Sequence, residues 1–178
     1  RRDPQEGDVE VLLSKRSKER IDSKIRDLVP RNWGSSLRAC IRRLNEYLRG
    51  WMGHFGICTV GEERTLQGLD AHIRRRLRAL QLKHWKRKRT MARKLIGLGV
   101  KKQTAWRNVY SGKKSLWALS HSPAADRGLC NAYFAERGLV SIATYWRQHH
   151  RDIVAPTQLR LLFGIGEVVT RPASGVIT

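Results

Sequence analysis

The chain has 178 residues, 40% of them hydrophobic, and six of these are Trp. That is enough apolar material for a packed core, which excludes a wholly disordered protein. Lys and Arg number 36 against 15 Asp and Glu, so the formal net charge is +21 and favours a polyanionic partner. Nucleic acid is the first candidate partner and an anionic membrane surface the second.

Other classes are disfavoured by what the sequence lacks. No run of about 18 apolar residues occurs, so no segment is expected to cross a membrane. Cys40, Cys58 and Cys130 are widely spaced and form no CxxC pair, which predicts neither a zinc site nor a disulfide framework and favours a reducing compartment. Cys40 and Cys130 are expected in or beside the core. The chain starts at Arg1 without an initiator Met or an apolar signal region, and we interpret it as part of a longer protein.

Two long amphipathic helices are predicted, after a shorter one over Ser17–Val29 that Pro30 ends. After a turn at residues 32–34, Ser35 or Ser36 is expected to cap the first long helix. Its apolar stripe repeats at the helical period and comprises Leu37, Ile41, Leu44, Leu48, Trp51, Met52 and Phe55. The arginines outside this stripe are Arg38, Arg42, Arg43 and Arg49.

The second long helix is expected to begin at Glu62 and Glu63, where acidic groups suit the positive end of the helix dipole. It runs to about Trp85, and its stripe comprises Leu66, Leu69, Ile73, Leu77 and Leu80. The further predicted helices cover residues 90–98, which Gly99 closes, 103–109, 123–138 and, by one or two more turns, 139–146. No secondary structure is predicted for residues 115–120. After Asp152, Gly and Pro recur and the helical pattern ends.

These patterns predict an all-α fold. We expect a linker over 1–16, a helical bundle over 17–89, a basic helical subdomain over 90–150 and a C-terminal tail over 151–178.

The distribution of charge is more informative than its total. No Asp or Glu occurs between Ala71 and Ala125, and Arg74 and Arg78 form a like-charge pair four residues apart. If about six cations of this window contacted phosphates, the logarithm of the affinity would fall with the logarithm of salt at a slope of about −4 to −5. A solvated basic face without a partner is the alternative, which the length of the window disfavours.

Aromatic residues interleave with these cations and have two interpretations. They could stack on unpaired bases, or they could belong to the core. Apolar neighbours favour the core for Trp51, Phe55 and Trp117. For Trp85 and Trp106 base stacking and core packing both stay open.

The segment Leu44–Phe55, which reads LNEYLRGWMGHF, resembles the LNxxLRGWxxYF segment of group II intron-encoded reverse transcriptases and maturases, with a local departure at His54. Further segments follow in the family's order and approximate spacing, so that the resemblance covers about residues 17–146. They are Ile73–Arg78, Trp85–Arg87, Leu95–Gly99, His121–Pro123, Asn131–Tyr133 and Gly138-Leu139.

The resemblance implies a thumb, or maturase-specific domain, which grips intron RNA and the RNA/DNA template–primer duplex and assists splicing in the bacterial cytoplasm. It assigns RNA contacts to Arg49, Arg74, Arg75, Arg76, Arg78, Lys86 and Arg87, and the cationic run adds Lys83, Lys88 and Arg89. Trp51 is expected in the core. Because Gly50 lacks a Cβ, we expect it to allow close helix packing.

Catalytic patterns are missing, so neither enzyme activity nor a bound cofactor is expected of this chain. A polymerase needs paired aspartates to hold its metals, and every Asp here is isolated, which places the family's palm upstream of the chain. No Cys pairs or His–Asn–His site of an endonuclease occur. The adjacent pair His149-His150 would point about 100° apart on a helix, which disfavours a metal site.

Two further patterns are interpreted as local structure and not as functional sites. Gly97-Leu98-Gly99 and Gly164-Ile165-Gly166 lack the Lys-Ser/Thr of a phosphate loop and are interpreted as helix stops. His121-Ser122 is interpreted as a turn before a helix, because no acid lies near in sequence.

An alternative function is a DNA-binding module that recognises the target site of a mobile element, since the same basic helices would suit DNA. A membrane-surface protein fits poorly because the Trp and Leu residues are used in packing stripes.

Overall fold

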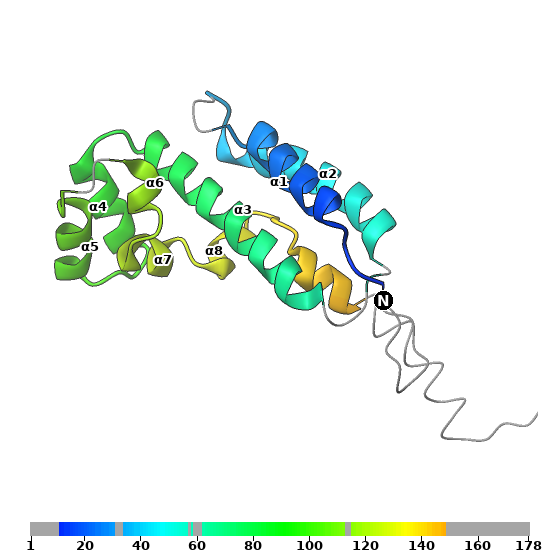
Figure 1. Ribbon diagram of the computed structural model, residues 1–178. Helices are drawn as coiled ribbons and strands as arrows, with labels where there is room; N and C mark the ends of the chain where they lie inside the picture. Colours follow the sequence, from blue (N-terminus) through cyan, green and yellow to red (C-terminus); the bar gives the residue numbers. More distant parts are fainter. Residues whose placement is uncertain (1–10, 31–33, 57, 59–61, 113–114, 149–178) are drawn as a thin grey trace, which may run out of the picture.

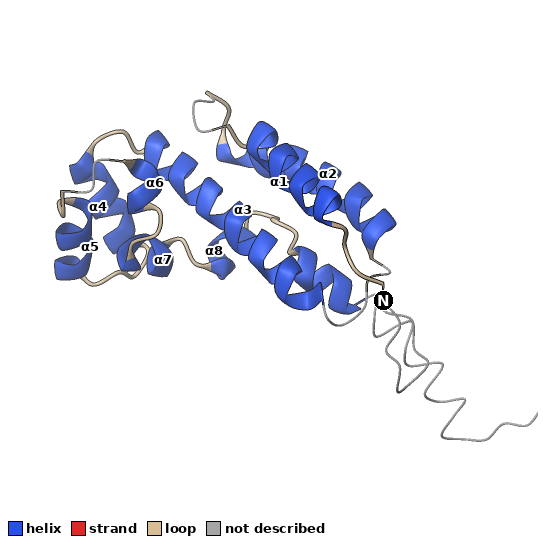
Figure 2. Cartoon of the chain, viewed as in Figure 1, coloured by secondary structure: helices blue, strands red, loops and turns tan. Residues whose placement is uncertain are grey.

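A computed structural model of the chain describes residues 11–30, 34–56, 58, 62–112 and 115–148. Within these residues every regular element is a helix and no strand occurs, which confirms the all-α prediction (Figure 2). None of the helices found there is long and apolar enough to cross a membrane. Several predictions lie outside the described residues. They are most of the predicted linker, residues 32 and 33 of the predicted turn, His149-His150 and the predicted tail with its Gly164–Gly166.

The first two helices both begin at a serine cap, although the sequence predicts a cap only for the second. α1 spans Lys15–Leu28 and α2 spans Leu37–Phe55. The hydroxyl of Ser14 accepts a hydrogen bond from the backbone N–H of Ser17, and Ser36 does the same for Ala39. Each cap satisfies an amide at a helix start that has no partner within the helix. The predicted Ser36 cap is therefore confirmed.

α3, which spans Glu63–His84, is the longest helix described, and the other elements pack around it. In Figure 1, α1 and α2 lie alongside α3, and the short helices of residues 88–128 gather at its C-terminal end. The short helices are α4 (Lys88–Gly97), α5 (Lys102–Val109), α6 (Leu116–Leu119), α7 (Pro123–Gly128) and α8 (Asn131–Ala135). A further helical segment covers residues 142–148.

Two hydrophobic cores hold these helices together. The first joins the apolar stripes of α1, α2 and α3 to residues 129–146, including Phe134 and Trp146. The second lies between α4, α5 and α7 and takes Leu82 from the end of α3. Each core therefore draws on residues from both sides of position 89. Trp85 packs against both cores and so joins them.

Three polar side chains of α3 bind the ends of other helices. The Asp70 carboxylate accepts hydrogen bonds from the Ser141 hydroxyl at 2.6 Å and from the amides of Ile142 and Ala143 at 2.9 and 3.2 Å. It thus caps the start of the 142–148 helix, where a negative charge is favourable. Arg76 and Arg78 bind carbonyls that follow α1 and α7, respectively.

The predicted helix over residues 123–138 is wrong as one element, because the chain breaks between α7 and α8. The Leu129 carbonyl at the break accepts a hydrogen bond from Arg78 Nε at 2.8 Å instead of continuing a helix. Gly128 just before it sits so close to α4 that an added Cβ would lie 2.8 Å from a methyl group of Leu95. The periodicity of the sequence predicts neither of these two contacts.

Other expectations have mixed outcomes. Cys40, Cys58 and Cys130 are all free, and Cys40 is buried while Cys130 packs partly buried against the first core, as expected. Trp51 is in the core. The expectation for Gly50 is wrong, because a Cβ there would have no atom within 4 Å and the residue is exposed.

Candidate nucleic-acid interface

Three depressions on the surface share lining residues and form one continuous feature, which we call the basic groove. The first two share Arg38 and Arg137, and the second and third share Gln81, Tyr133 and Arg137. The Lys and Arg side chains that line the groove are Arg38, Arg42, Arg49, Arg93, Lys94 and Arg137. All six residues are exposed.

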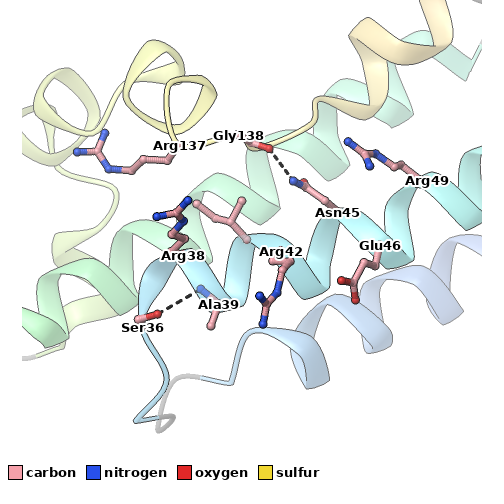
Figure 3. Close-up of a pocket in the computed structure, with 10 residues that line it drawn as sticks. Ser36, Arg38, Ala39, Arg42, Asn45, Glu46, Arg49, Arg137 and Gly138 are labelled. Carbon is pink, nitrogen blue, oxygen red and sulfur yellow. Dashed lines mark hydrogen bonds between the residues drawn. The ribbon is translucent and has the colours of Figure 1, made fainter.

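The first depression lies between α2 and the connection that follows α8 (Figure 3). Arg38, Arg42 and Arg49 project from the side of α2 opposite its buried stripe. Asn45 holds the facing wall, since its Nδ2 donates to the Gly138 carbonyl at 2.6 Å and its Oδ1 accepts from the Val140 amide at 3.0 Å. These two hydrogen bonds join segments more than ninety positions apart in the chain and set the width of the depression.

Arg137 stands where the three depressions meet. Its guanidinium lies 3.5 Å from the centroid of the Tyr133 ring, and its Nη1 donates to the Tyr133 carbonyl at 2.8 Å. Glu136 adds an exposed ion pair at 3.8 Å. Burial raises the pKa of the Tyr133 phenol, and the positive charge of Arg137 only partly opposes this. The ring is therefore a neutral surface that holds the guanidinium plane in place.

The third depression lies between the end of α3 and the exposed side of α4. Gln81 and Trp85 line one wall, and Arg93 and Lys94 line the other. Thr90, Gly97 and Leu98 complete the α4 side. Positions 90, 93, 94 and 97 follow the helical period, while Met91, Ala92 and Leu95 point into the second core.

Residues 18–96 match the family model described as "Group II intron, maturase-specific domain". This part of the chain is similar to that domain. The match confirms the stated resemblance over residues 18–96, and a comparison with curated proteins found no match. The match indicates a role in group II intron maturation, which is splicing.

The matched residues cover most of α1, all of α2 and α3, and most of α4. They therefore include five of the six cations that line the groove and exclude Arg137. The wall that Arg137 and Gly138 form comes from the chain after the match.

The RNA contacts predicted from the sequence fall into separate environments. Arg49 lines the basic groove, and Lys86, Arg87, Lys88 and Arg89 are exposed at the junction of α3 and α4. Lys86 has a φ of 56°, a left-handed conformation that turns the chain sharply between the two helices. Lys88 also lies 5.6 Å from the centroid of the Tyr110 ring. Arg74 and Lys83 are half-buried.

Three of the predicted contacts are engaged with other parts of the protein. Arg76 is 8% exposed and donates to the carbonyls of Val29 and Arg26. Arg78 is 7% exposed and pairs with Asp126 at 2.5 Å, and burial lowers its pKa although the Asp126 charge opposes the shift.

Arg75, the third of them, packs over the Trp117 ring at 4.1 Å. Its Nε is buried without a hydrogen-bond partner. The arginines of α3 therefore do not form one open patch, because the helix turns about 100° per residue.

The aromatic predictions separate in the same way. Trp85 is half-buried and lines the third depression. Trp106 is half-buried against the second core and stacks on the exposed Tyr110, with ring centroids 5.4 Å apart. Phe55 stacks on the buried Trp51 and packs against the first core as expected. Trp117 is half-buried over Arg75 and His72, which differs from the expected core position.

Sequence reasoning did not select Arg38, Arg42, Arg93, Lys94 or Arg137 as contacts. A signal existed for the first two, because they lie outside the apolar stripe of their helix. Arg93 and Lys94 stood in the acid-free window. Arg137 had no signal, since only the fold places it opposite α2.

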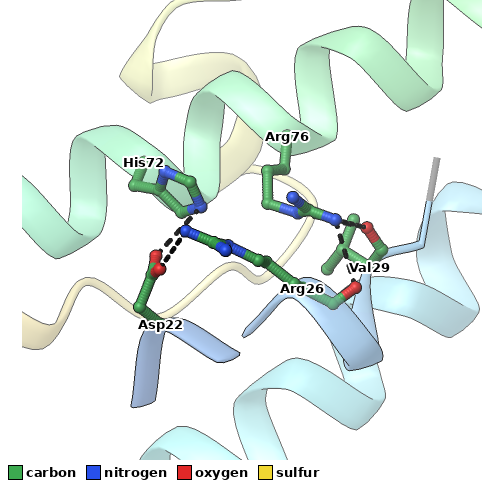
Figure 4. Close-up of polar contacts among 5 residues, drawn as sticks. All are labelled: Asp22, Arg26, Val29, His72 and Arg76. Atoms are coloured by element: carbon green, nitrogen blue, oxygen red, sulfur yellow. Dashed lines mark hydrogen bonds and ion pairs between the residues drawn. The ribbon is translucent and has the colours of Figure 1, made fainter. Parts of the chain in front are cut away.

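A polar cluster lies between α1 and α3 (Figure 4). Asp22 pairs with Arg26 at 2.5 Å, and its second oxygen lies 3.4 Å from His72 Nε2, a contact not aligned for a hydrogen bond. Burial lowers the pKa of His72; Asp22 opposes this, while Arg76 and Arg26 add to it. Among the described residues no group of three His, Cys, Asp or Glu is placed to hold a metal ion.

Proposed function

We propose that the chain binds group II intron RNA in the basic groove, with the exposed residues Lys86–Arg89 at the junction of α3 and α4 as a second set of phosphate contacts. The observation that carries this proposal is the continuity of the three depressions around Arg137, lined by six exposed cations. Guanidinium groups bind phosphate oxygens in pairs, so these side chains suit an RNA backbone.

The electrostatic balance of the groove supports a polyanion. Two acidic residues, Glu46 and Glu136, also line it, against six Lys and Arg. Glu136 forms an ion pair with Arg137. Both side chains are exposed, so the pair contributes little energy. The lining therefore stays positive, and neutralising phosphates there would release counterions.

The test measures RNA affinity against salt concentration by fluorescence anisotropy, with a folded group II intron RNA fragment. The triple variant Arg38→Gln, Arg42→Gln, Arg49→Gln should weaken binding and reduce the slope of the log–log salt plot by about 2 to 2.7, or 0.7 to 0.9 per phosphate contact. A matched control is Arg16→Gln, Arg20→Gln, Lys24→Gln, which removes the same charge from exposed positions of α1 outside the groove. Equal losses in both variants would show that total charge, and not the groove, governs binding.

Duplex DNA of equal length and charge is the competitor in the same assay. The wide, shallow minor groove of RNA exposes 2′-hydroxyls and RNA also offers unpaired segments, which suit a groove with aromatic and amide residues as well as cations. A preference for DNA at fixed salt would instead support target-site recognition by a mobile-element protein.

A more specific role and a cellular location belong to the same proposal. The maturase-specific domain would grip the RNA/DNA template–primer duplex when joined to a polymerase palm upstream in the same protein. The bacterial cytoplasm stays a prediction for the location. Primer extension by the parent protein, with and without the groove substitutions, tests the first role, because a weakened grip shortens the products made per binding event.

A further inference from the structure

The third depression differs in chemistry from the rest of the basic groove. The first depression is lined by arginines with no aromatic residue. The third contains the half-buried Trp85, the buried Tyr133 and the apolar Leu98, with Arg93, Lys94 and Arg137 beside them. Gln81 adds an amide that both donates and accepts hydrogen bonds. An apolar and aromatic lining with a few polar groups is typical of a site for a small flat ligand.

We infer that the third depression is a pocket for one unpaired nucleobase of the bound RNA. The inference rests on the proposed function, since the base would belong to an RNA strand held in the groove. Bases that leave a duplex stack on aromatic rings or on the plane of an Arg guanidinium. The pocket offers both surfaces, in Trp85 and in Arg137.

Arg137 is already arranged as a stacking surface. Its guanidinium lies 3.5 Å from the Tyr133 ring centroid, and the hydrogen bond to the Tyr133 carbonyl holds it there. The side chain nevertheless keeps 40% of its surface exposed, so part of the guanidinium is open to a ligand. A base placed there would meet a plane whose position does not change on binding, which lowers the entropy lost on association.

The surrounding charges match a nucleotide within a strand. Arg93 and Lys94 are exposed on the α4 side and can neutralise the phosphates on either side of the base. The pocket shares Gln81, Tyr133 and Arg137 with the second depression, so the strand can continue along the groove. A paired base keeps both of its faces in the helical stack and cannot reach Trp85. The pocket therefore selects a bulged, looped or terminal nucleotide.

Gly97 allows the pocket to be blocked without disturbing the fold. It lines the pocket on α4, it is exposed, and a Cβ added to it would have no atom within 4 Å. The variant Gly97→Leu fills space that is open, and a helical Gly is in any case less stable than a residue with a side chain. Gly68→Leu is the matched control, because Gly68 is an exposed glycine of α3 with the same open surroundings and lines none of the three depressions.

The test compares the affinities of the full chain for two RNA hairpins, one with a single bulged nucleotide and one fully paired in its stem. Wild type and Gly68→Leu should bind the bulged hairpin about five- to tenfold more tightly. Gly97→Leu should lose this preference and bind the two hairpins with similar affinity. A wild type without any preference, or a Gly97→Leu variant that retains it, would overturn the pocket while leaving RNA binding in the groove intact.

Arg137→Lys is an independent variant that keeps the charge but not the planar surface. It should leave the salt dependence of binding unchanged and lower the preference for the bulge at least threefold, since one of two stacking surfaces is lost. A photoreactive 5-iodouridine at the bulge should crosslink to Trp85 or Tyr133 in wild type, and crosslinking only outside the pocket would contradict the assignment. If wild type bound neither hairpin, the proposed function would be rejected, and the pocket with it.

Discussion

Arg76 of α3 joins the end of α1 to the centre of the protein through the carbonyl of Val29, which accepts hydrogen bonds from Nη2 at 2.8 Å and from Nε at 3.2 Å. Nη2 also donates to the Arg26 carbonyl at 3.1 Å. The C-terminal carbonyls of a helix lack partners within the helix and carry a partial negative charge. The buried guanidinium of Arg76 therefore donates hydrogen bonds to the carbonyls at the end of α1, which have no partner within that helix (Figure 4).

Replacing Arg76 with Gln should lower the free energy of unfolding by about 2 to 3 kcal/mol, because buried carbonyls lose charged donors and a shorter side chain does not reach them. Arg74→Gln removes the same charge from a half-buried position and should stay within about 0.5 kcal/mol of wild type. Urea unfolding monitored by circular dichroism measures both. Similar midpoints for the two variants would contradict the bridging role of Arg76.

Asp70→Ala should release the 142–148 helix. The variant loses the carboxylate that accepts three hydrogen bonds at that helix start, and we expect a loss of about 1 to 2 kcal/mol. Hydrogen exchange of the amides in residues 142–148 should accelerate much more than exchange in α5, which does not contact Asp70. Asp27→Ala on the exposed side of α1 serves as the control.

Asn45→Ala should affect both stability and RNA binding. It removes both hydrogen bonds that hold residues 138–140 against α2, so we expect a loss of about 1 to 2 kcal/mol in unfolding free energy. Because the Arg137 wall of the basic groove would no longer be fixed, RNA affinity should fall although no cation is removed. An unchanged affinity in a destabilised variant would show that the position of this wall does not matter.

Glu46→Gln is expected to strengthen RNA binding about two- to threefold at low salt, because it removes an exposed negative charge from the lining of the groove. The gain should shrink as salt rises. Glu19→Gln removes an exposed acid from α1, outside the groove, and should change affinity less. Titrations of both variants at two salt concentrations provide the comparison, and a larger gain from Glu19→Gln would locate the RNA elsewhere.

Acidification should destabilise the protein through His72. Its pKa is lowered in the folded state from the ordinary 6.5, first by burial and then by the nearby Arg76, Arg26 and Arg75 against the opposing charge of Asp22. Its contribution to stability is thus complete above about pH 6.5 and is lost as pH falls through the folded pKa, because the unfolded chain takes up the proton more readily.

The measurement is the melting temperature of wild type and His72→Gln between pH 7.5 and pH 5.5. The decrease on acidification should be smaller in the variant, which has no imidazole at this position, while the remaining histidines are common to both. Parallel decreases would show that His72 is not the group responsible.

Local pattern was sufficient for the long helices. The stripes of α2 and α3 and the cap at Ser36 depend on contacts between residues three or four apart, which the order of residues displays directly. The same applies to the family segment Leu44–Phe55, whose apolar members Leu44, Leu48, Trp51 and Met52 are buried.

The basic side chains needed the tertiary structure. An Arg looks the same in the sequence whether it faces solvent or binds a carbonyl fifty residues away, as Arg76 and Arg78 do. The wall opposite α2 likewise exists only because Asn45 binds Gly138, ninety-three positions further on. Helix positions thus follow from short-range periodicity, whereas the partner of a long polar side chain is decided by which distant carbonyls and carboxylates the packed helices bring within its reach.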